Sequence, residues 1–288
     1  MKDSSKKLQN IFVVWGMAAI CCCLWGSAFP IIKIGYNLFN IDSLDTASII
    51  LFAGIRFILA GVLTVAIFSA VNKKFVKPKK TSISKVCVLA LFQTVLQYLF
   101  FYIGLAHTTG VKSSIIDGSS TFFAIIISVF IFKQEKFTVS KIIGSLLGFS
   151  GVALAGLSGS RQGFSFQFGD IMLLISAISY SCSSVFMKKY SNDDEPAVLS
   201  GYQFVLGGAV MTVVGLVMGG KVSTDNIKSV LVLLYLGFIS AIAYSLWGLL
   251  LKYNDVSRVT VCGSMTPIFG FTLSYLLLGE DNGKLVYK

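Results

Sequence analysis

Residues 53–61 read AGIRFILAG, and residues 200–208 read SGYQFVLGG. The two stretches share glycine at their second and ninth positions, phenylalanine at the fifth and leucine at the seventh. Residues 121–135 and 266–280 extend the similarity at nearly the same separation along the chain. Because similarity at a fixed spacing indicates an internal repeat, we predict that the chain is built from two copies of one structural unit.

Long apolar blocks contain and surround these stretches. Hydrophobic residues make up 55% of the 288 residues and charged residues only 13%, whereas a soluble domain carries about 25% charged residues. A block of about 20 apolar residues can cross the ~30 Å hydrocarbon core of a bilayer, and in lipid such a segment satisfies its own backbone as a helix. The sequence therefore predicts an all-α integral membrane protein with helices at residues 11–35, 47–70, 85–106, 114–132, 139–157, 169–187, 197–218, 228–251 and 259–278.

The repeat and the order of the helices together predict the topology. The first copy covers residues 11–157 and holds five helices, and the second covers residues 169–280 and holds four. Because five is an odd number, the second copy enters the membrane from the opposite side. Such inverted repeats are typical of secondary transporters, whose substrate site lies near the midplane between the halves. Residues 281–288 are too short to cross a bilayer, so we expect a non-helical tail and no tenth helix.

The net charge of +11 is explained by the membrane topology. Most of the 24 basic residues fall at the N-terminus and in alternate loops, which the positive-inside rule assigns to the cytoplasm. We therefore expect a multi-pass protein of the plasma membrane with a cytoplasmic N-terminus, and no nucleic-acid partner. These basic residues are Lys2, Lys6, Lys7, Lys73, Lys74, Lys77, Lys79, Lys80, Lys85, Lys133, Lys136, Lys141, Lys188, Lys189, Lys252 and Arg258.

Several short motifs resemble those of a known family. They are WGSAFP at residues 25–30 followed by Lys33, the pair Arg56–Phe57, the glutamates Glu135 and Glu280, and IGSLLG at residues 143–148. In this order they are similar to the EamA-type members of the drug/metabolite transporter superfamily. The resemblance implies two inverted five-helix repeats, with a central cavity formed by helices one, three, four, six, eight and nine.

Prolines are expected to mark the hinges, because proline removes a backbone donor and permits a kink. Pro30 lies in the first helix and Pro267 in the ninth. The family also has a proline in helix four, where this chain has Phe122. We therefore expect helix four to be straighter than in the family.

Two charged residues lie well inside predicted helices. A charge such as that of Arg56 near mid-bilayer costs about 2.5–3.5 kcal/mol, so Arg56 should face protein or water, and an interaction with Asp117, direct or through water, is one hypothesis. The alternative is that Arg56 extends outward and caps carbonyl groups. Gln93 and Gln97 share a helix face and either line the cavity or bond to neighbouring helices. The predicted cavity residues are Trp25, Ser27, Gln93, Gln97, Tyr98, Asp117, Tyr180, Tyr244, Trp247 and Thr266.

The sequence favours a secondary transporter that exports small metabolites, amino acids or drugs by alternating access. A channel-like pore and a non-transporting membrane scaffold are the alternatives. The chain has one histidine and none of the common catalytic or phosphate-binding motifs, so no enzymatic activity, cofactor or metal site is expected. The predicted partners are a small-molecule substrate and the lipid bilayer, and a homodimer is left open.

Overall fold

The computed structural model describes residues 2–42, 44–108, 116–136, 138–141, 167–223 and 226–278, together with the isolated positions 113, 143, 144, 146, 147 and 150. Within these ranges the chain is helical apart from connecting turns, and no strand is present. Seven helices are long and apolar enough to cross a membrane. They are α2 (Ile11–Leu38), α3 (Thr46–Val71), the span Lys80–Ala106, α9 (Phe168–Tyr190), α10 (Pro196–Val217), α11 (Ile227–Tyr253) and the span Val256–Leu278.

Three of the predicted helices are built from shorter pieces. The span Lys80–Ala106 contains α4 (Ile83–Leu89), the π-helical stretch η2 (Ala90–Leu96) and α5 (Gln97–Ala106). The fourth helix is a shorter apolar helix made of α7 (Ser120–Ile126) and the π-helical stretch η3 (Ile127–Ile131). The ninth combines α12 (Val256–Thr260), the 3₁₀ turn η4 (Val261–Ser264) and α13 (Met265–Leu278). A short helix, α1 (Lys2–Gln9), precedes the first span.

The predicted helices coincide with these elements apart from the fifth. Most of residues 139–157, and all of the tail 281–288, lie outside the described residues. Polar residues set where several helices begin. Asn10 accepts a hydrogen bond from Phe12 N ahead of α2, and Asp45 accepts one from Ser48 N ahead of α3, so each side chain satisfies a free N–H of the first turn.

Helices α3 and α10 cross in an antiparallel contact that allows almost no side chain between them. A Cβ atom on Gly54 would lie 2.9 Å from Gly208 O, and one on Gly61 would lie 2.6 Å from Gly201 O. In the repeat, Gly54 aligns with Gly201 and Gly61 with Gly208. Exchanging the two copies therefore converts one contact into the other, as expected for a pseudo-two-fold axis in an inverted repeat. The predicted inverted repeat is confirmed.

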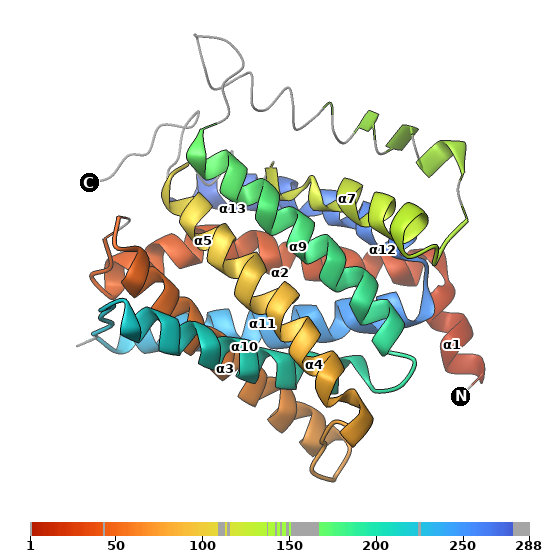
Figure 1. The fold of residues 1–288 in the computed structure, drawn as a ribbon, viewed down its shortest axis with the longest axis horizontal. Helices are drawn as coiled ribbons and strands as arrows, with labels where there is room; N and C mark the ends of the chain where they lie inside the picture. Colours follow the sequence, from red (N-terminus) through yellow and green to blue (C-terminus); the bar gives the residue numbers. More distant parts are fainter. Residues whose placement is uncertain are drawn as a thin grey trace.

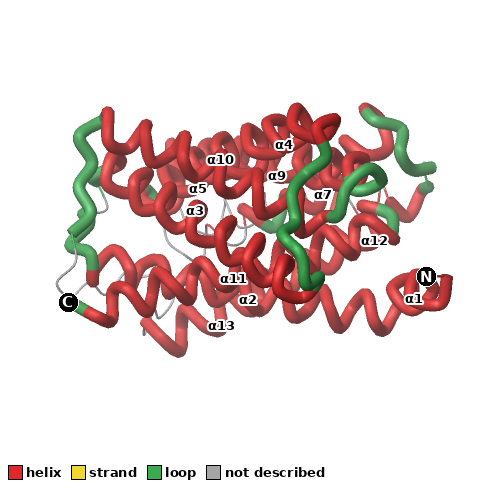
Figure 2. The backbone as a smooth tube through the Cα atoms, turned by 90° about the horizontal axis from the view of Figure 1, so that it is seen from below, coloured by secondary structure: helices red, strands yellow, loops and turns green. Residues whose placement is uncertain are grey.

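The remaining helices surround this crossing in equivalent pairs. Helix α2 packs on α11 and α13, and its repeat mate α9 packs on α5 and α7. Figure 2 shows α2 and α13 along one long side of the bundle and α10 and α4 along the other. Figure 1 shows these helices running roughly along the long axis of the molecule. The turns that connect them therefore lie at the two ends of the bundle.

The predicted basic segments meet at one end of the molecule, which we call the lysine-rich end. It comprises residues 2–10, 72–85, 132–136, 138–141, 188–195 and 252–258. Lys85 Nζ lies 2.5 Å from Asp193 Oδ2, and Lys252 Nζ lies 3.0 Å from Glu195 Oε1. Lys85 holds the pKa of the Asp193 carboxyl below its ordinary value through a hydrogen bond and its charge. The ion pair between Lys85 and Asp193 thus joins the two repeats at this end, whereas that between Lys252 and Glu195 lies within the second repeat.

Candidate substrate cavity

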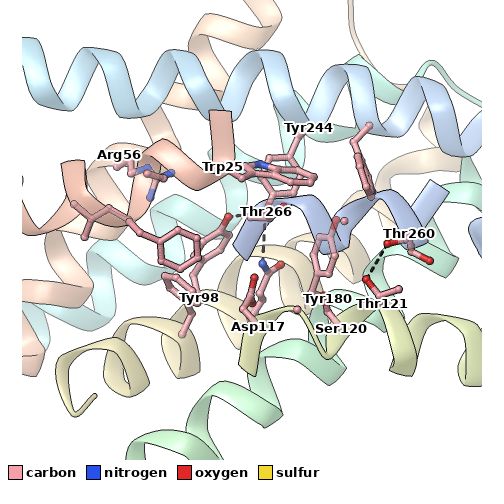
Figure 3. Close-up of a pocket in the computed structure, with 18 residues that line it drawn as sticks. Trp25, Arg56, Tyr98, Asp117, Ser120, Thr121, Tyr180, Tyr244, Thr260 and Thr266 are labelled. Atoms are coloured by element: carbon pink, nitrogen blue, oxygen red, sulfur yellow. Dashed lines mark hydrogen bonds between the residues drawn. The ribbon is translucent and has the colours of Figure 1, made fainter. Parts of the chain in front are cut away.

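A cavity lies between the two halves, close to the middle of the helices (Figure 3). The space open to the centre of a water-sized sphere is about 70 Å³. This is several times the ~10–15 Å³, on the same measure, that one water molecule requires. Residues of all six helices predicted to form the cavity contribute, and α3 adds Arg56. The lining residues are Trp25, Ala28, Phe29, Ile32, Arg56, Gln97, Tyr98, Phe101, Asp117, Gly118, Ser120, Thr121, Tyr180, Tyr244, Trp247, Thr260, Gly263 and Thr266.

Most of the predicted cavity residues are brought together here. Those in the lining are Trp25, Gln97, Tyr98, Asp117, Tyr180, Tyr244, Trp247 and Thr266. Ser27 and Gln93 lie outside it. The Ser27 hydroxyl donates to Leu24 O and shares a second hydrogen bond with Tyr235, so Ser27 joins α2 to α11. Gln93 is buried in the π-helical stretch, one turn before Gln97.

Aromatic side chains form one wall of the cavity. The ring centroid of Trp25 lies 4.9 Å from that of Trp247, 5.1 Å from Tyr244 and 6.2 Å from Tyr180, all in edge-on arrangements. Each such contact contributes about 0.5–1.5 kcal/mol beyond the burial of area. Trp25 and Tyr180 are also repeat mates, so the pseudo-two-fold axis that relates α2 to α9 brings their rings together.

Arg56 is held inside the protein by hydroxyl groups. Its Nη1 donates to Tyr102 OH at 2.7 Å and its Nη2 donates to Ser240 Oγ at 3.0 Å. The residue is only 2% exposed. The alternative in which Arg56 extends outward is therefore wrong, because the guanidinium connects α3 to α5 and α11 within the bundle.

The direct interaction between Arg56 and Asp117 is not formed in this conformation. Both residues line the cavity, but the hydrogen bonds of Arg56 go to Tyr102 and Ser240. Among the described residues, the Asp117 carboxylate makes no hydrogen bond or ion pair. A water-mediated interaction stays a prediction.

Helices four and nine both lose regular structure where they border the cavity. Ile116 and Asp117 are helical, Gly118 and Ser119 form a turn, and α7 begins at Ser120. In helix nine, the 3₁₀ turn η4 contains Gly263. Discontinuous helices at the midplane are a common source of polar backbone at transporter sites. The repeat alignment pairs Gly118 with Gly263, and this pairing is the sequence signal that could have identified both as cavity residues.

The proline positions differ from each other in their surroundings. Pro30 lies within α2, which is α-helical from Ile11 to Leu38. Pro267 lies in the first turn of α13, directly after η4. Helix four carries Phe122 in place of a proline, and α7 changes to π-helical geometry at Ile127. That helix four is straighter than in the family stays a prediction. The hinge roles of Pro30 and Pro267 stay predictions.

Comparison with known proteins identifies the chain. The model of the EamA-like transporter family matches it twice, over residues 13–157 and 167–285. The chain belongs to the EamA-like transporter family. An uncharacterized transporter of Archaeoglobus fulgidus is 24% identical over 92% of this chain and 90% of its own length. The S-adenosylmethionine/S-adenosylhomocysteine transporter of Chlamydia muridarum is 23% identical over 90% of this chain and 82% of its own.

A solved structure shares the fold of this chain. It superposes with a TM-score of 0.71 over 93% of this chain and 88% of its own, at 17% sequence identity. Such a likeness establishes the fold. Membership of the EamA-like family places the chain among multi-pass membrane transporters, and the described residues contain no group of His, Cys, Asp and Glu side chains that could hold a metal ion.

In this EamA-family chain, contacts between helices four and nine close the path from the cavity to the lysine-rich end. Thr121 Oγ1 donates to Thr260 O at 2.8 Å. Further along, the Glu135 carboxylate accepts hydrogen bonds from Ser257 N at 3.0 Å, from the Ser257 hydroxyl, and from Lys141 Nζ at 2.7 Å. Burial opposes ionisation of Glu135, but the hydrogen bonds from Lys141 and Ser257 outweigh it and hold its pKa below the ordinary value.

Substitutions of Arg56 and of a residue that it contacts should show non-additive effects on stability, whereas substitutions of Arg56 and of a residue that it does not contact should add. We expect the losses in unfolding free energy caused by Arg56→Gln and Asp117→Asn to add within about 0.3–0.5 kcal/mol, because the two residues share no partner among the described residues. Stronger coupling would support the water-mediated interaction instead. Arg56→Gln removes the donor and Tyr102→Phe removes the acceptor of the same hydrogen bond. These two substitutions should instead show coupling of about 0.5–3 kcal/mol. Denaturant titration of the three single and two double variants in detergent measures both. Equal coupling in the two pairs would contradict this assignment.

Proposed function

We propose that this EamA-family chain is a secondary carrier that exports a small amphipathic solute from the cell by alternating access. In this proposal the N-terminus and the lysine-rich end face the cytoplasm, in the plasma membrane. The observation that carries it is the cavity between two inverted halves, lined by the six helices expected to form it. Small metabolites, amino acids and drugs are the classes of solute that such a cavity suits, and the Chlamydia muridarum relative is named for two small metabolites.

Unsatisfied polar atoms support a solute-binding role for the cavity. Five side chains of the lining have buried polar atoms without a partner among the described residues. They are Trp25 Nε1, Arg56 Nε, Gln97 Oε1, Tyr180 OH and Trp247 Nε1. A buried donor or acceptor that lacks a partner costs about 1–3 kcal/mol. Water or a polar solute in the cavity would supply the missing hydrogen bonds, whereas a purely structural core would have apolar groups at these positions.

The closed lysine-rich end supports alternating access rather than a continuous pore. The contacts Thr121–Thr260 and Glu135–Ser257 join helix four of one repeat to helix nine of the other on one side of the cavity. By the symmetry of an inverted repeat, the same helices can approach each other on the opposite side. Opening one pair of contacts while the other closes would expose the cavity to one side of the membrane at a time.

A matched pair of tryptophan variants tests the carrier proposal. Trp25 lies in the cavity and makes three ring contacts, whereas Trp15 lies on the same helix and is 52% exposed. Untargeted profiling of the medium of cells that express the chain should reveal a small solute enriched over an empty-vector control. Because each lost ring contact is worth about 0.5–1.5 kcal/mol, Trp25→Ala should reduce this enrichment roughly tenfold or more, and Trp15→Ala should leave it unchanged.

Counterflow of the identified solute then separates a carrier from a pore. Proteoliposomes preloaded with unlabelled solute should accumulate the labelled solute transiently, with a rate that saturates. A flux that rises linearly with concentration would support the channel-like alternative. The absence of any enriched solute, or equal losses in Trp15→Ala and Trp25→Ala, would contradict the proposal.

A further inference from the structure

The cavity presents one carboxylate that has no partner among the described residues. Asp117 lines the cavity, is half-buried, and lies directly before the turn at Gly118 and Ser119 that precedes α7. Asp117 makes no hydrogen bond or ion pair with any described residue. A carboxylate kept away from bulk water without a partner is costly. A ligand that brings a positive charge with N–H donors would remove this cost.

The other charged group of the cavity is already engaged. Both Nη atoms of Arg56 donate to hydroxyl groups of the protein, which leaves its buried Nε as the guanidinium donor without a partner among the described residues. Because Arg56 is only 2% exposed, a carboxylate on a solute would have little access to this cation. Asp117 is therefore the more available of the two charged groups in the lining.

Aromatic and apolar side chains surround Asp117. Figure 3 shows Asp117 between the labelled side chains of Tyr98 and Tyr180, with Trp25 across the cavity. Aromatic faces attract cations by about 0.5–2 kcal/mol, and a charge-assisted hydrogen bond to a carboxylate is roughly twice as strong as a neutral one.

We propose that Asp117 forms a subsite for a protonated amine, so that the solute is a small organic amine with an apolar or aromatic body. The inference rests on the proposed function, because it takes the cavity to be the solute site. The ammonium group would donate to the Asp117 carboxylate beside Tyr180, and the apolar body would lie against Phe29 and Phe101, which also line the cavity. Asp117 aligns with Cys262 in the second repeat, so the amine subsite belongs to one half only.

Three probes that differ in one group test the charge requirement. They are phenethylamine, 2-phenylethanol and 3-phenylpropionate, titrated into the purified full chain in detergent. Two of the three tryptophans line the cavity, so tryptophan fluorescence excited at the red edge reports binding. Phenethylamine should bind with at least tenfold higher affinity than either analogue. Failure of phenethylamine to bind, or equal binding of the neutral or anionic analogue, would overturn the proposal.

Substitutions assign the selectivity to Asp117. Asp117→Asn should reduce the affinity for phenethylamine at least tenfold, to that of 2-phenylethanol, whereas Asp117→Glu should retain the preference for the amine. Asp42→Asn, which changes an exposed carboxylate outside the cavity, should behave as the unmodified chain. If Asp117→Asn retains the amine preference while eluting as a single folded species, the proposal is overturned. Because no gradient or flux is involved, amine binding without counterflow would contradict the carrier proposal alone.

Discussion

A leucine in place of Gly208 is expected to prevent most of the chain from reaching its folded state. A Cβ atom at this position would lie 2.6 Å from Ile58 N and 2.8 Å from Gly54 O, which are backbone atoms of α3. Backbone atoms cannot rotate away as a side chain can, so the two helices would have to separate. The expected cost is at or above the ~1–3 kcal/mol typical of overpacked cores. The yield of monodisperse protein from detergent-solubilised membranes measures it.

A second glycine supplies a matched control. Gly16 lies on α2, and a Cβ atom there would meet nothing within 4 Å. Gly16→Leu adds the same side chain to a helix in the same membrane environment, so its yield should be close to that of the unmodified chain. If Gly208→Leu and Gly16→Leu gave the same yield, the close crossing of α3 and α10 would not be what organises the fold.

The features that the sequence predicts well are those imposed by the bilayer and the repeat. The length of each apolar block is set by the thickness of the hydrocarbon core, which is why the predicted helices coincide with α2, α3, α9, α10 and α11. The paired glycines mark the crossing because helices in a membrane approach closely only through small residues. Neither feature depends on knowing which side chains meet.

Individual side-chain partners depend on the rotation of each helix, which a uniformly apolar sequence does not specify. Tyr102 and Ser240 as partners of Arg56 come from two other helices, and nothing in the spacing of residues distinguishes them from other hydroxyls. The same holds for Ser27, which faces α11 instead of the cavity. The interruptions at Gly118 and Gly263 are different, because the repeat alignment pairs them. The repeat alignment could therefore have predicted both interruptions from the sequence.

The second strong effect is expected from Glu135→Gln. The Glu135 side chain is fully buried and accepts hydrogen bonds from both Lys141 and Ser257. A glutamine would direct its own N–H groups toward these donors or leave the Lys141 ammonium without a counter-charge. Hydrogen bonds to charged groups contribute about 1.5–3 kcal/mol each. Local opening of α12 should therefore become roughly 10–100 times more frequent, which hydrogen exchange of the amides of residues 256–260 measures.

Glu195→Gln is the control, because Glu195 also pairs with a lysine at the lysine-rich end but its side chain is 55% exposed. Such surface pairs contribute about 0.2–1 kcal/mol, so hydrogen exchange in α12 should change by a factor of about five at most in this variant. Equal effects of the two substitutions would show that Glu135 is an ordinary surface partner and has no special part in closing the lysine-rich end.

The same contact predicts how closure of the lysine-rich end depends on pH. The hydrogen bonds of Glu135 lower its pKa, so its stabilising contribution is fully present above the ordinary glutamate value of about 4.3 and is lost as pH falls through the lowered pKa. Exchange in α12, corrected for the intrinsic rate at each pH, should stay constant from about pH 8 to pH 5 and rise only below the ordinary value. Glu135→Gln should remove this rise because it has no proton to gain. A transition near neutral pH that persists in Glu135→Gln would assign the pH response to another group.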